Sequence, residues 1–250
     1  MAPSNPRRSQ LGQAMVETVV VIFVTLLLLL GVIQFGLIYN AKTTLNYAAF
    51  EAARAGALNY ADKAAIEYAL ARGLAPLFTS VSTADGPLTK VKKVQNARDE
   101  VLDEIRAGEF ACIERLNPPD SSFSHYAVND PTGNFPGEDL IPNDHLHYRK
   151  AVPTGGLSIQ DANLLKLRIT YCYPMYVPVI STTIKRLMGL TTESTSLVAT
   201  GQTGATHATL TPKGSFQSNC YSKDRFPIVA QAIVRMQTPI KNDLFPPSCD

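Results

Sequence analysis

Several common signatures are missing from this chain of 250 residues, and each absence narrows its function. It has no tryptophan, so the aromatic residues expected where a helix leaves a membrane are Tyr39 and Tyr47. The net charge is only +2 and no long basic run occurs, which gives no case for nucleic-acid binding. Neither a Walker A motif nor G-x-G-x-x-G is present, which excludes nucleotide sites of those types.

Catalytic and metal-binding motifs are also weak. Ser158 lies in a G-L-S-I-Q stretch that begins like a nucleophile elbow but lacks its second glycine. His145 and His147 share a face of an extended segment, as metal ligands can, yet the spacing fixes no third ligand. The acids of segment 130–144 lack the spacing of an EF-hand loop, which favours a solvated loop. We therefore expect no enzyme activity, no cofactor and no metal site; a membrane-tethered hydrolase is the least supported alternative.

The chain does have one long apolar run, Met15 to Ile38, whose only formal charge is Glu17. At about 1.5 Å per residue, this run can cross a hydrocarbon core of about 30 Å. No Ala-x-Ala cleavage site comes after it, so the run is unlike a secretory signal that is removed. A carboxylate at the centre of a lipid-exposed helix costs roughly 2.5–3.5 kcal/mol, and less near an end. Glu17 is therefore predicted to be a functional residue with a partner.

The residues before the run suggest that partner. Arg7 and Arg8 belong to a short basic leader that ends at Gly12; the pair also occurs in twin-arginine signals, but the next three residues continue that motif poorly. A cut after Gly12 would make Gln13 the new N-terminus and leave Glu17 fifth in the mature chain. The new ammonium group would attract the Glu17 carboxylate of a neighbouring subunit strongly at the low-dielectric membrane edge. The alternative is a tolerated glutamate in an ordinary anchor.

The stretch 11–57 resembles the N-terminus of TadE-like proteins, which are pseudopilins of the tight-adherence pilus system. Gly12, Glu17 and the alanine-rich stretch 51–56 match that family's leader glycine, glutamate, apolar helix and amphipathic continuation. Phe23 stands where many members carry a proline, and the residue after the cut is also less usual. The specific likeness covers about the first quarter of the chain.

The resemblance implies a membrane-anchored minor pilin or pseudopilin for tight-adherence (type IVc-like) pilus assembly, processed by a prepilin peptidase. Its partners would be that peptidase, other pilins and pseudopilins, the tight-adherence secretion machinery and the lipid bilayer, with no nucleic acid. The leader arginines, against Lys42 alone beyond the span, favour a cytoplasmic N-terminus, a bacterial inner-membrane anchor and a periplasmic domain. The alternative function is a single-pass anchored periplasmic domain that binds a surface, glycan or partner and does not enter a pilus.

The predicted fold is α+β and pilin-like, with a long N-terminal transmembrane and amphipathic helix, one or two further helices and a small antiparallel sheet. The expected parts are a leader (1–12), a transmembrane helix (13–39), its extracytoplasmic continuation (40–58) and a periplasmic domain (59–250). The continuation carries a small-residue stripe that fits packing against other pilin helices or against the protein's own domain equally well. The stripe consists of Ala41, Leu45, Ala48, Ala52 and Ala55.

Periodicity and chain breakers predict the remaining elements. A second helix is expected over 62–74. A third is expected over 88–107, with a core-facing side made of Leu88, Val91, Val94, Val101, Leu102 and Ile105. Alternation predicts strands over 110–116, 165–173 and 228–236. A long surface loop is expected over 130–144, and irregular chain over 191–219.

All four cysteines lie beyond the span: Cys112, Cys172, Cys220 and Cys249. Their even number and the lack of a C-x-x-C pair indicate up to two disulfides, whereas zinc binding does not suit the spacing. Three pairings are possible. We favour Cys220–Cys249, because that bond would hold a tail ending in PPSC and could contribute on the order of 3–4 kcal/mol. Cys172 is expected on the polar face of its strand, where a disulfide could hold a covering loop.

Overall fold

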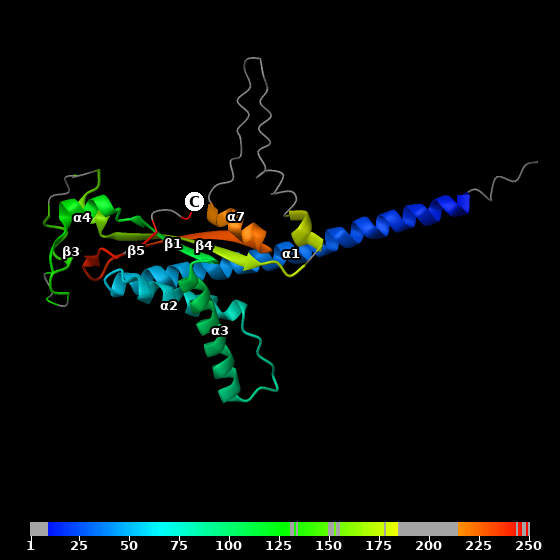
Figure 1. Cartoon of the computed structure of the whole chain (residues 1–250), viewed down its shortest axis with the longest axis horizontal. Helices are drawn as coiled ribbons and strands as arrows, with labels where there is room; N and C mark the ends of the chain where they lie inside the picture. The colour runs from blue at the N-terminus through cyan, green and yellow to red at the C-terminus, as the bar shows by residue number, and fades with distance from the viewer. Residues whose placement is uncertain are drawn as a thin grey trace, which may run out of the picture.

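The computed structural model describes residues 10–130, 133, 135–149, 153, 156–177, 179–184, 215–243, 245–246 and 249. A long helix extends from one side of a domain in which further helices pack around small antiparallel sheets (Figure 1). The predicted α+β class is therefore confirmed.

The long helix, α1 (Gln10–Leu58), is continuous through the predicted span and its predicted continuation. Its 49 residues make it roughly 74 Å long. The helix ends where Tyr60 and Ala61 adopt positive φ angles of 57° and 59°, which reverse the chain. Asp62 then caps α2 (Lys63–Leu74), because its carboxylate accepts a hydrogen bond from the Ala65 amide at 2.9 Å. The second predicted helix is thus confirmed.

Helix α2 packs along the C-terminal half of α1 and leads through the short η2 (Ala75–Leu77) toward α3 (Pro87–Ala107). The approach between the first two helices is close. A Cβ atom added at Gly73 would lie 2.6 Å from the Cβ of Ala48. Glycine at this position therefore allows the two backbones to meet.

Helix α3 has the predicted length, and Gly108 ends it with a φ of 67°. Its predicted core face is only half right. Leu88, Val91 and Val94 are 79%, 54% and 45% exposed, whereas the buried residues are Ala97, Val101, Leu102 and Ile105. The N-terminal half of α3 projects from the body of the domain, so it has no core to face (Figure 1). Periodicity identified an apolar face but could not say whether another element covers it.

The main sheet has the order β1-β4-β5, and both pairings are antiparallel. Its strands are β1 (Ala111–Asn117), β4 (Leu164–Pro174) and β5 (Arg225–Arg235), which confirms the three predicted strands with shifted ends. Alternate residues of β4 form the centre of the core between this sheet and α1. They are Leu165, Leu167, Ile169 and Tyr171, all fully buried.

The opposite face of this sheet carries α7 (Ser215–Ser222), as Figure 1 shows. The prediction of irregular chain over 191–219 is therefore wrong for its last residues, which begin α7; residues 191–214 lie outside the described part of the chain. Thr170 and Cys172 of β4, on this face, are buried rather than exposed to solvent, and Cys172 is bonded to α7.

A second, smaller sheet has the order β2-β3-β6 and is also antiparallel. It consists of β2 (Val128–Asn129), β3 (Asp139–Ile141) and β6 (Ile240–Lys241). The predicted loop over 130–144 is thus wrong in part, because β3 lies within it and Leu140 is fully buried. A strand this short has too few residues for an alternation signal. The other helical segments of the described chain are α4 (Asp120–Tyr126), α5 (Ile159–Ala162) and residues 179–184.

Candidate functional site

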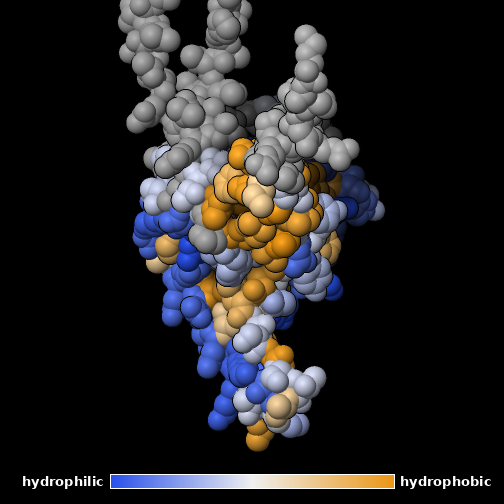
Figure 2. All heavy atoms as spheres, turned by 90° about the vertical axis from the view of Figure 1, so that its right-hand side faces the viewer, coloured by the Kyte–Doolittle hydropathy of each residue, from blue (hydrophilic) through white to orange (hydrophobic). Residues whose placement is uncertain are grey.

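The N-terminal half of α1 projects from the domain with its large apolar side chains uncovered. Within the described part of the chain, α1 is the one helix long and apolar enough to span a membrane, and its most apolar stretch has no buried residue. Figure 2 views the molecule from the side on which this helix projects and shows apolar surface gathered around it. An apolar surface of this extent needs lipid or other helices to cover it. The helix could therefore serve as a single-pass anchor.

Glu17 lies on this projecting part of α1 and is exposed. Within the described residues its side chain forms no hydrogen bond or ion pair with the rest of its own chain. Gly12 and Gln13 lie in the same helix one turn earlier, and their side chains are outside the described part. The predicted cleavage site and the predicted carboxylate are thus on one continuous helix that the domain does not shield.

The small-residue stripe of α1 packs against the protein's own domain. Ala41, Leu45, Ala48 and Ala52 are fully buried, while Ala55 is partly buried against the same core. The elements that cover the stripe are α2, β4 and β5. Of the two partners that the sequence left open, the structure shows the domain itself.

Gln34, a fully buried amide in the apolar run, is a contact that was not predicted from the sequence. Its Oε1 accepts a hydrogen bond from the Val177 amide at 2.9 Å, so the chain that comes after β4 is fixed to α1 at this level. Its Nε2 is buried and has no partner among the described residues. The signal in the sequence was a lone polar residue four positions before Ile38, on the helix face that is buried further along.

A groove of about 570 Å³ lies between α1 and the start of β5, close to Gln34 along the helix. Lys42 lines it and its Nζ donates a hydrogen bond to the Val229 carbonyl. Burial lowers the pKa of the Lys42 ammonium group. The other lining residues are Phe35, Ile38, Tyr39, Phe226, Pro227, Ile228 and Val229.

All four cysteines form disulfides, but the favoured pairing is wrong. Cys112 pairs with Cys249, across 137 positions of sequence, and Cys172 pairs with Cys220, across 48. The C-terminal tail is therefore held at β1 and not at α7. The expectation that the tail is bonded is correct, but the folded position of each strand decides which cysteine is near.

The Cys172–Cys220 bond joins β4 to the helix that covers it. Alternation along the strand predicts Cys172 on the polar face with a loop held over it; the covering element is instead α7, and the side chain of Cys172 is fully buried. The face of β4 that carries Cys172 was predicted correctly. Its surroundings were not, because α7 shields this end of the face from water.

A partly buried polar cluster joins α3 to the main sheet. Glu104 of α3 accepts hydrogen bonds from the Tyr171 hydroxyl at 3.0 Å and from the Arg225 guanidinium at 2.8 Å. Arg225 also lies over the ring of Phe110, 3.6 Å from its centroid. Burial, reinforced by the Glu104 carboxylate, raises the pKa of Tyr171. Tyr171 thus stays protonated as a donor, which suits a structural contact.

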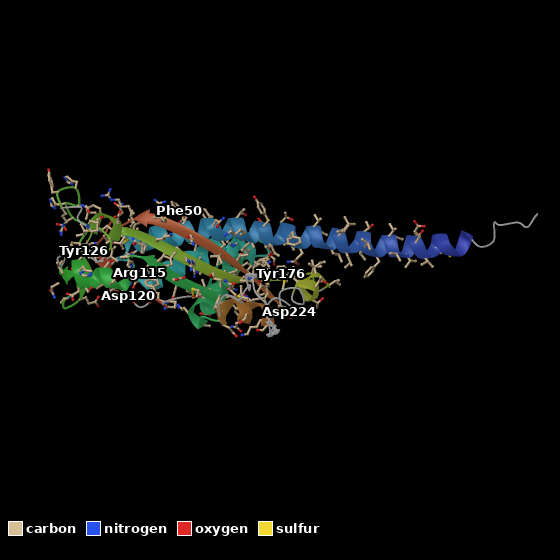
Figure 3. The ribbon with its side chains drawn as sticks, turned by 90° about the horizontal axis from the view of Figure 1, so that it is seen from above. Phe50, Arg115, Asp120, Tyr126, Tyr176 and Asp224 are labelled. Atoms are coloured by element: carbon tan, nitrogen blue, oxygen red, sulfur yellow. A yellow bond between two sulfur atoms is a disulfide. The ribbon has the colours of Figure 1, made fainter. Side chains whose placement is uncertain are left out.

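A second arginine, Arg115, makes a cluster of contacts at the end of the domain that is far from the predicted span. Arg115 of β1 and Asp120 of α4 lie together there, as Figure 3 shows, with Nη2 of Arg115 2.5 Å from Oδ1 of Asp120. The guanidinium lies over the rings of Phe123 and Phe245 at 4.8 and 5.3 Å. Burial lowers the pKa of Arg115, although the Asp120 hydrogen bond opposes that shift. The cluster joins β1, α4 and the tail.

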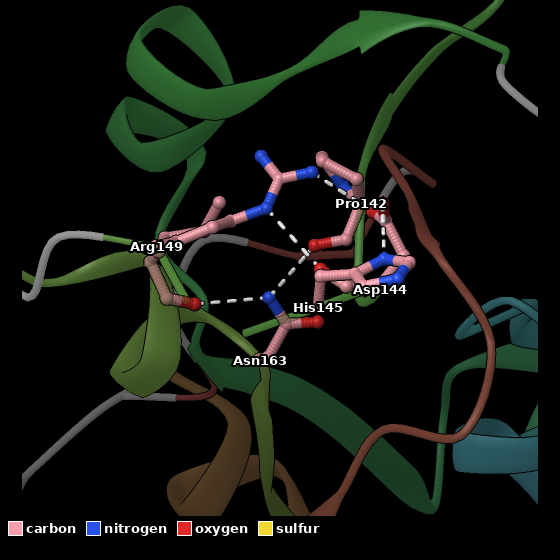
Figure 4. Close-up of polar contacts among 6 residues, drawn as sticks. Pro142, Asp144, His145, Arg149 and Asn163 are labelled. Atoms are coloured by element: carbon pink, nitrogen blue, oxygen red, sulfur yellow. Dashed lines mark hydrogen bonds and ion pairs between the residues drawn. The ribbon is translucent and has the colours of Figure 1, made fainter. Parts of the chain in front are cut away.

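The histidines that were considered as metal ligands lie in the loop after β3. Figure 4 shows Asp144 between His145, 3.4 Å away, and Arg149, 2.9 Å away. Asn163 donates to the Pro142 carbonyl at 3.1 Å in the same view. The ring of His147 lies 3.9 Å from that of Tyr148. Among the described residues, no group of three or more His, Cys, Asp or Glu side chains could hold a metal ion.

The N-terminal part of this chain matches a protein-family model. The family model described as TadE-like protein covers residues 12–54, from Gly12 through Glu17 into the buried alanine stripe. Comparisons with curated proteins and with solved structures yield no match. The resemblance noted from the residues is confirmed over this segment. Together with the apolar helix, the match is consistent with a pilin-like protein related to the tight-adherence pilus, and it implies association with pilus components in general.

Proposed function

From its TadE-like N-terminal segment, we propose that this protein is a minor pilin or pseudopilin in tight-adherence pilus assembly. In this proposal α1 anchors it in the bacterial inner membrane, with a cytoplasmic N-terminus and a periplasmic domain. A prepilin peptidase removes the leader after Gly12. The protein acts by assembling with other pilins and the secretion machinery and not as an enzyme.

The observation that carries the proposal is the position of Glu17. It is exposed on the uncovered half of α1, without a partner among the described residues. In lipid such a carboxylate would cost up to roughly 2.5–3.5 kcal/mol. A neighbouring subunit could remove that cost if its Gln13 carried a free ammonium group. Because only cleavage creates that group, the uncleaved protein would lack the partner that assembly needs.

The division of α1 into two halves supports the same proposal. The domain packs on the C-terminal half, and the described part of the chain leaves the N-terminal half uncovered. Neighbouring subunits can therefore bring their apolar helices together without displacing any contact within the domain. A helix packed inside its own domain along its whole length could not do so.

The direct experiment is Glu17→Ala in cells that make the pilus. We expect pili to be lost while the protein remains in the membrane fraction, because the change removes an assembly contact and no insertion determinant. Glu100→Ala is a matched control, since Glu100 is an exposed glutamate on α3. Normal piliation of Glu17→Ala cells would contradict the proposal.

Mass spectrometry of the mature N-terminus tests the processing step separately. We expect the chain to begin at Gln13 in cells with the peptidase and at residue 1 or 2 in cells without it. If all of the protein kept residues 3–12 in the presence of the peptidase, the cleavage and the Glu17 pairing would both be wrong.

The second candidate function is an anchored periplasmic interaction domain that stays outside a pilus. The projecting half of α3 favours it, because Leu88, Val91 and Val94 are exposed there and lysines lie beside them. Normal pili in Glu17→Ala cells, together with a loss of function in a Leu88→Ser, Val91→Ser double variant, would favour this candidate over the first.

A further inference from the structure

A short segment after β4 contacts α1 just where its apolar surface begins to be covered. We call residues 175–177 and 179–184 the collar; its last six residues are helical. The hydrogen bond from the Val177 amide to Gln34 Oε1, at 2.9 Å, fixes the collar to α1. Gln34 itself is fully buried beneath it. The collar therefore has a defined level along the membrane helix.

The collar adds to the uncovered apolar surface of α1. Tyr176 and Val179 of the collar are 55% and 47% exposed, and Phe35 and Tyr39 of α1 are 62% and 72% exposed. Figure 3 places Tyr176 at the end of the domain from which the free part of α1 extends. Figure 2 looks along the projecting helix and shows its apolar surface on this side of the domain. The exposed apolar residues of the collar and of α1 thus lie on either side of the Val177–Gln34 hydrogen bond.

The polar groups of the collar are largely satisfied within it. The hydroxyls of Thr182 and Thr183 both donate to the Val179 carbonyl at 2.9 Å, and the Ser181 amide donates to the Val177 carbonyl at 2.9 Å. Both threonine hydroxyls thus have a partner inside the collar. A segment whose hydroxyls are satisfied internally suits an environment poorer in water than bulk solvent.

The length of α1 places the collar at a membrane surface. The helix from Met15 to Ile33, which ends just before Gln34, is roughly 28 Å long at 1.5 Å per residue. A bilayer core is about 30 Å thick. If the uncovered stretch spans that core, Gln34 lies at its boundary. Tyr39 and Tyr176 then lie at the depth where tyrosines concentrate in membrane proteins.

We propose that the collar is a second membrane contact, which inserts into the headgroup region of the leaflet through which α1 leaves the bilayer. The partner is a phospholipid bilayer, because the collar surface continues the surface of the anchor itself. The groove between α1 and the start of β5 fits this role: its walls are mainly apolar, and Lys42 supplies one cation that a lipid phosphate could meet. The inference rests on the proposed anchoring of α1.

The collar would fix how the domain sits on the membrane. A single apolar helix can tilt and shift in depth at modest cost, because the bilayer and flanking residues adapt. A second contact to one side of the helix restricts both depth and rotation. The Glu17 carboxylate, on the same rigid helix, would then be held at one depth in every subunit.

The absence of tryptophan makes the test direct, since one introduced tryptophan reports alone. The full chain carrying Val179→Trp is reconstituted in phosphatidylethanolamine–phosphatidylglycerol vesicles that contain lipids brominated at shallow or deep acyl positions. We expect blue-shifted emission and stronger quenching by shallow than by deep bromines. Ile22→Trp, within the span, should be quenched best by deep bromines. Val91→Trp, exposed on α3, should not be quenched.

These three reporters separate the collar from the anchor. Quenching of Ile22→Trp without quenching of Val179→Trp would overturn the collar contact and leave the anchoring intact. Blue-shifted but unquenched Val179→Trp would show that protein covers the collar, which also overturns the proposal. Absence of quenching at Ile22→Trp would overturn the anchoring itself and, with it, the proposed function.

The role of Gln34 is tested in the Val179→Trp protein. Gln34→Leu removes the acceptor of the Val177 amide, and we expect shallow quenching to fall at least twofold while helix content and disulfides are unchanged. Ile33→Leu is the matched control, because Ile33 is exposed at the adjacent position and belongs neither to the collar nor to the groove. Equal quenching with Gln34→Leu would show that this hydrogen bond does not position the collar.

Discussion

The two halves of α1 belong to one uninterrupted helix but have opposite surroundings. Before Gln34, the helix consists mainly of valine, leucine and isoleucine, and most of these side chains are exposed. After Ile38, the inward positions are mainly alanine, and those side chains are fully buried against α2 and the main sheet. Large side chains provide apolar area for lipid, whereas small ones let other backbones approach closely. The inward face of the second half is apolar like the first half, so on that face residue size distinguishes the two.

The glycines of α1 also differ between the two halves, in the space around them. A Cβ atom added at Gly31 or Gly36, in the first half of α1, would have no neighbour within 4 Å. One added at Gly56, in the second half, would lie 2.8 Å from Ile66 and 2.9 Å from Leu165. A methyl group at Gly56 would therefore force neighbouring side chains to shift, whereas one at Gly31 or Gly36 would meet nothing.

The largest expected effect on stability comes from truncating a leucine in the second half of α1, compared with a leucine in the first half. Leu45→Ala removes a fully buried side chain and should lower the free energy of unfolding by about 2–5 kcal/mol. Leu29→Ala removes an exposed side chain and should leave the domain's stability unchanged. Thermal unfolding of the full chain in detergent, followed by near-ultraviolet circular dichroism, measures both. Equal destabilisation would show that the domain depends on the projecting half as well.

A smaller effect is expected from adding one methyl group. Gly73→Ala would place a Cβ atom 2.7 Å from the Ala48 Cα, so α1 and α2 must separate. We expect a loss of about 1–3 kcal/mol in the free energy of unfolding. Gly36→Ala adds the same group where nothing is near and should stabilise the helix slightly, by about 0.5–1 kcal/mol. The same melting experiment compares the two, and a stable Gly73→Ala protein would contradict the close α1–α2 contact.

The smallest expected effect on stability concerns Glu67. The domain buries this acid, whereas Glu17 on the projecting half of α1 is exposed. Desolvation raises the pKa of Glu67, and the cations of Lys63 and Arg106, 3.9 and 3.8 Å away, only partly offset it. The folded state therefore holds this proton more tightly than the unfolded state, so the contribution of Glu67 to stability falls as pH rises through its folded-state pKa. Because the site is partly exposed, solvent screening keeps this contribution small.

Glu67→Gln should consequently raise the melting temperature slightly at neutral pH and leave it unchanged in acid, below the ordinary glutamate range. Glu100→Gln is the control, since Glu100 is exposed and its replacement should shift neither value. A Glu67→Gln protein that is less stable at neutral pH would show that the two ion pairs outweigh the cost of burial.

Local patterns in the sequence were enough to predict most of the elements. Strand β4 has an uninterrupted alternation, and Asp62 and Gly108 are standard helix ends. The disulfides could not be predicted, because the tertiary fold decides which cysteines meet. The register of β1 and β4 places Cys112 opposite Thr170, only two positions along β4 from Cys172. Cys172 nevertheless bonds to α7, and the tail returns to Cys112.

The candidate site was predictable in part. Glu17 stands out because it is the only charge in an apolar run. Gln34 could have been noticed by its helical spacing to Ile38, Ala41 and Leu45, all of which are buried. Its partner Val177 could not, because no local pattern links two positions so far apart. The exposure of the N-terminal half of α3 could not be predicted for a similar reason. An amphipathic pattern does not show whether the core extends beneath the apolar face.

The contact between Lys42 and the Val229 carbonyl has a consequence for how copies of this protein can associate. β5 is the outermost strand of its sheet, and outermost strands invite pairing with a foreign chain through unpaired backbone groups. Here Lys42 occupies one such carbonyl, and Pro227 two residues earlier has no amide hydrogen to offer. Over this stretch β5 therefore lacks two of the backbone groups that pairing with a neighbouring strand would use.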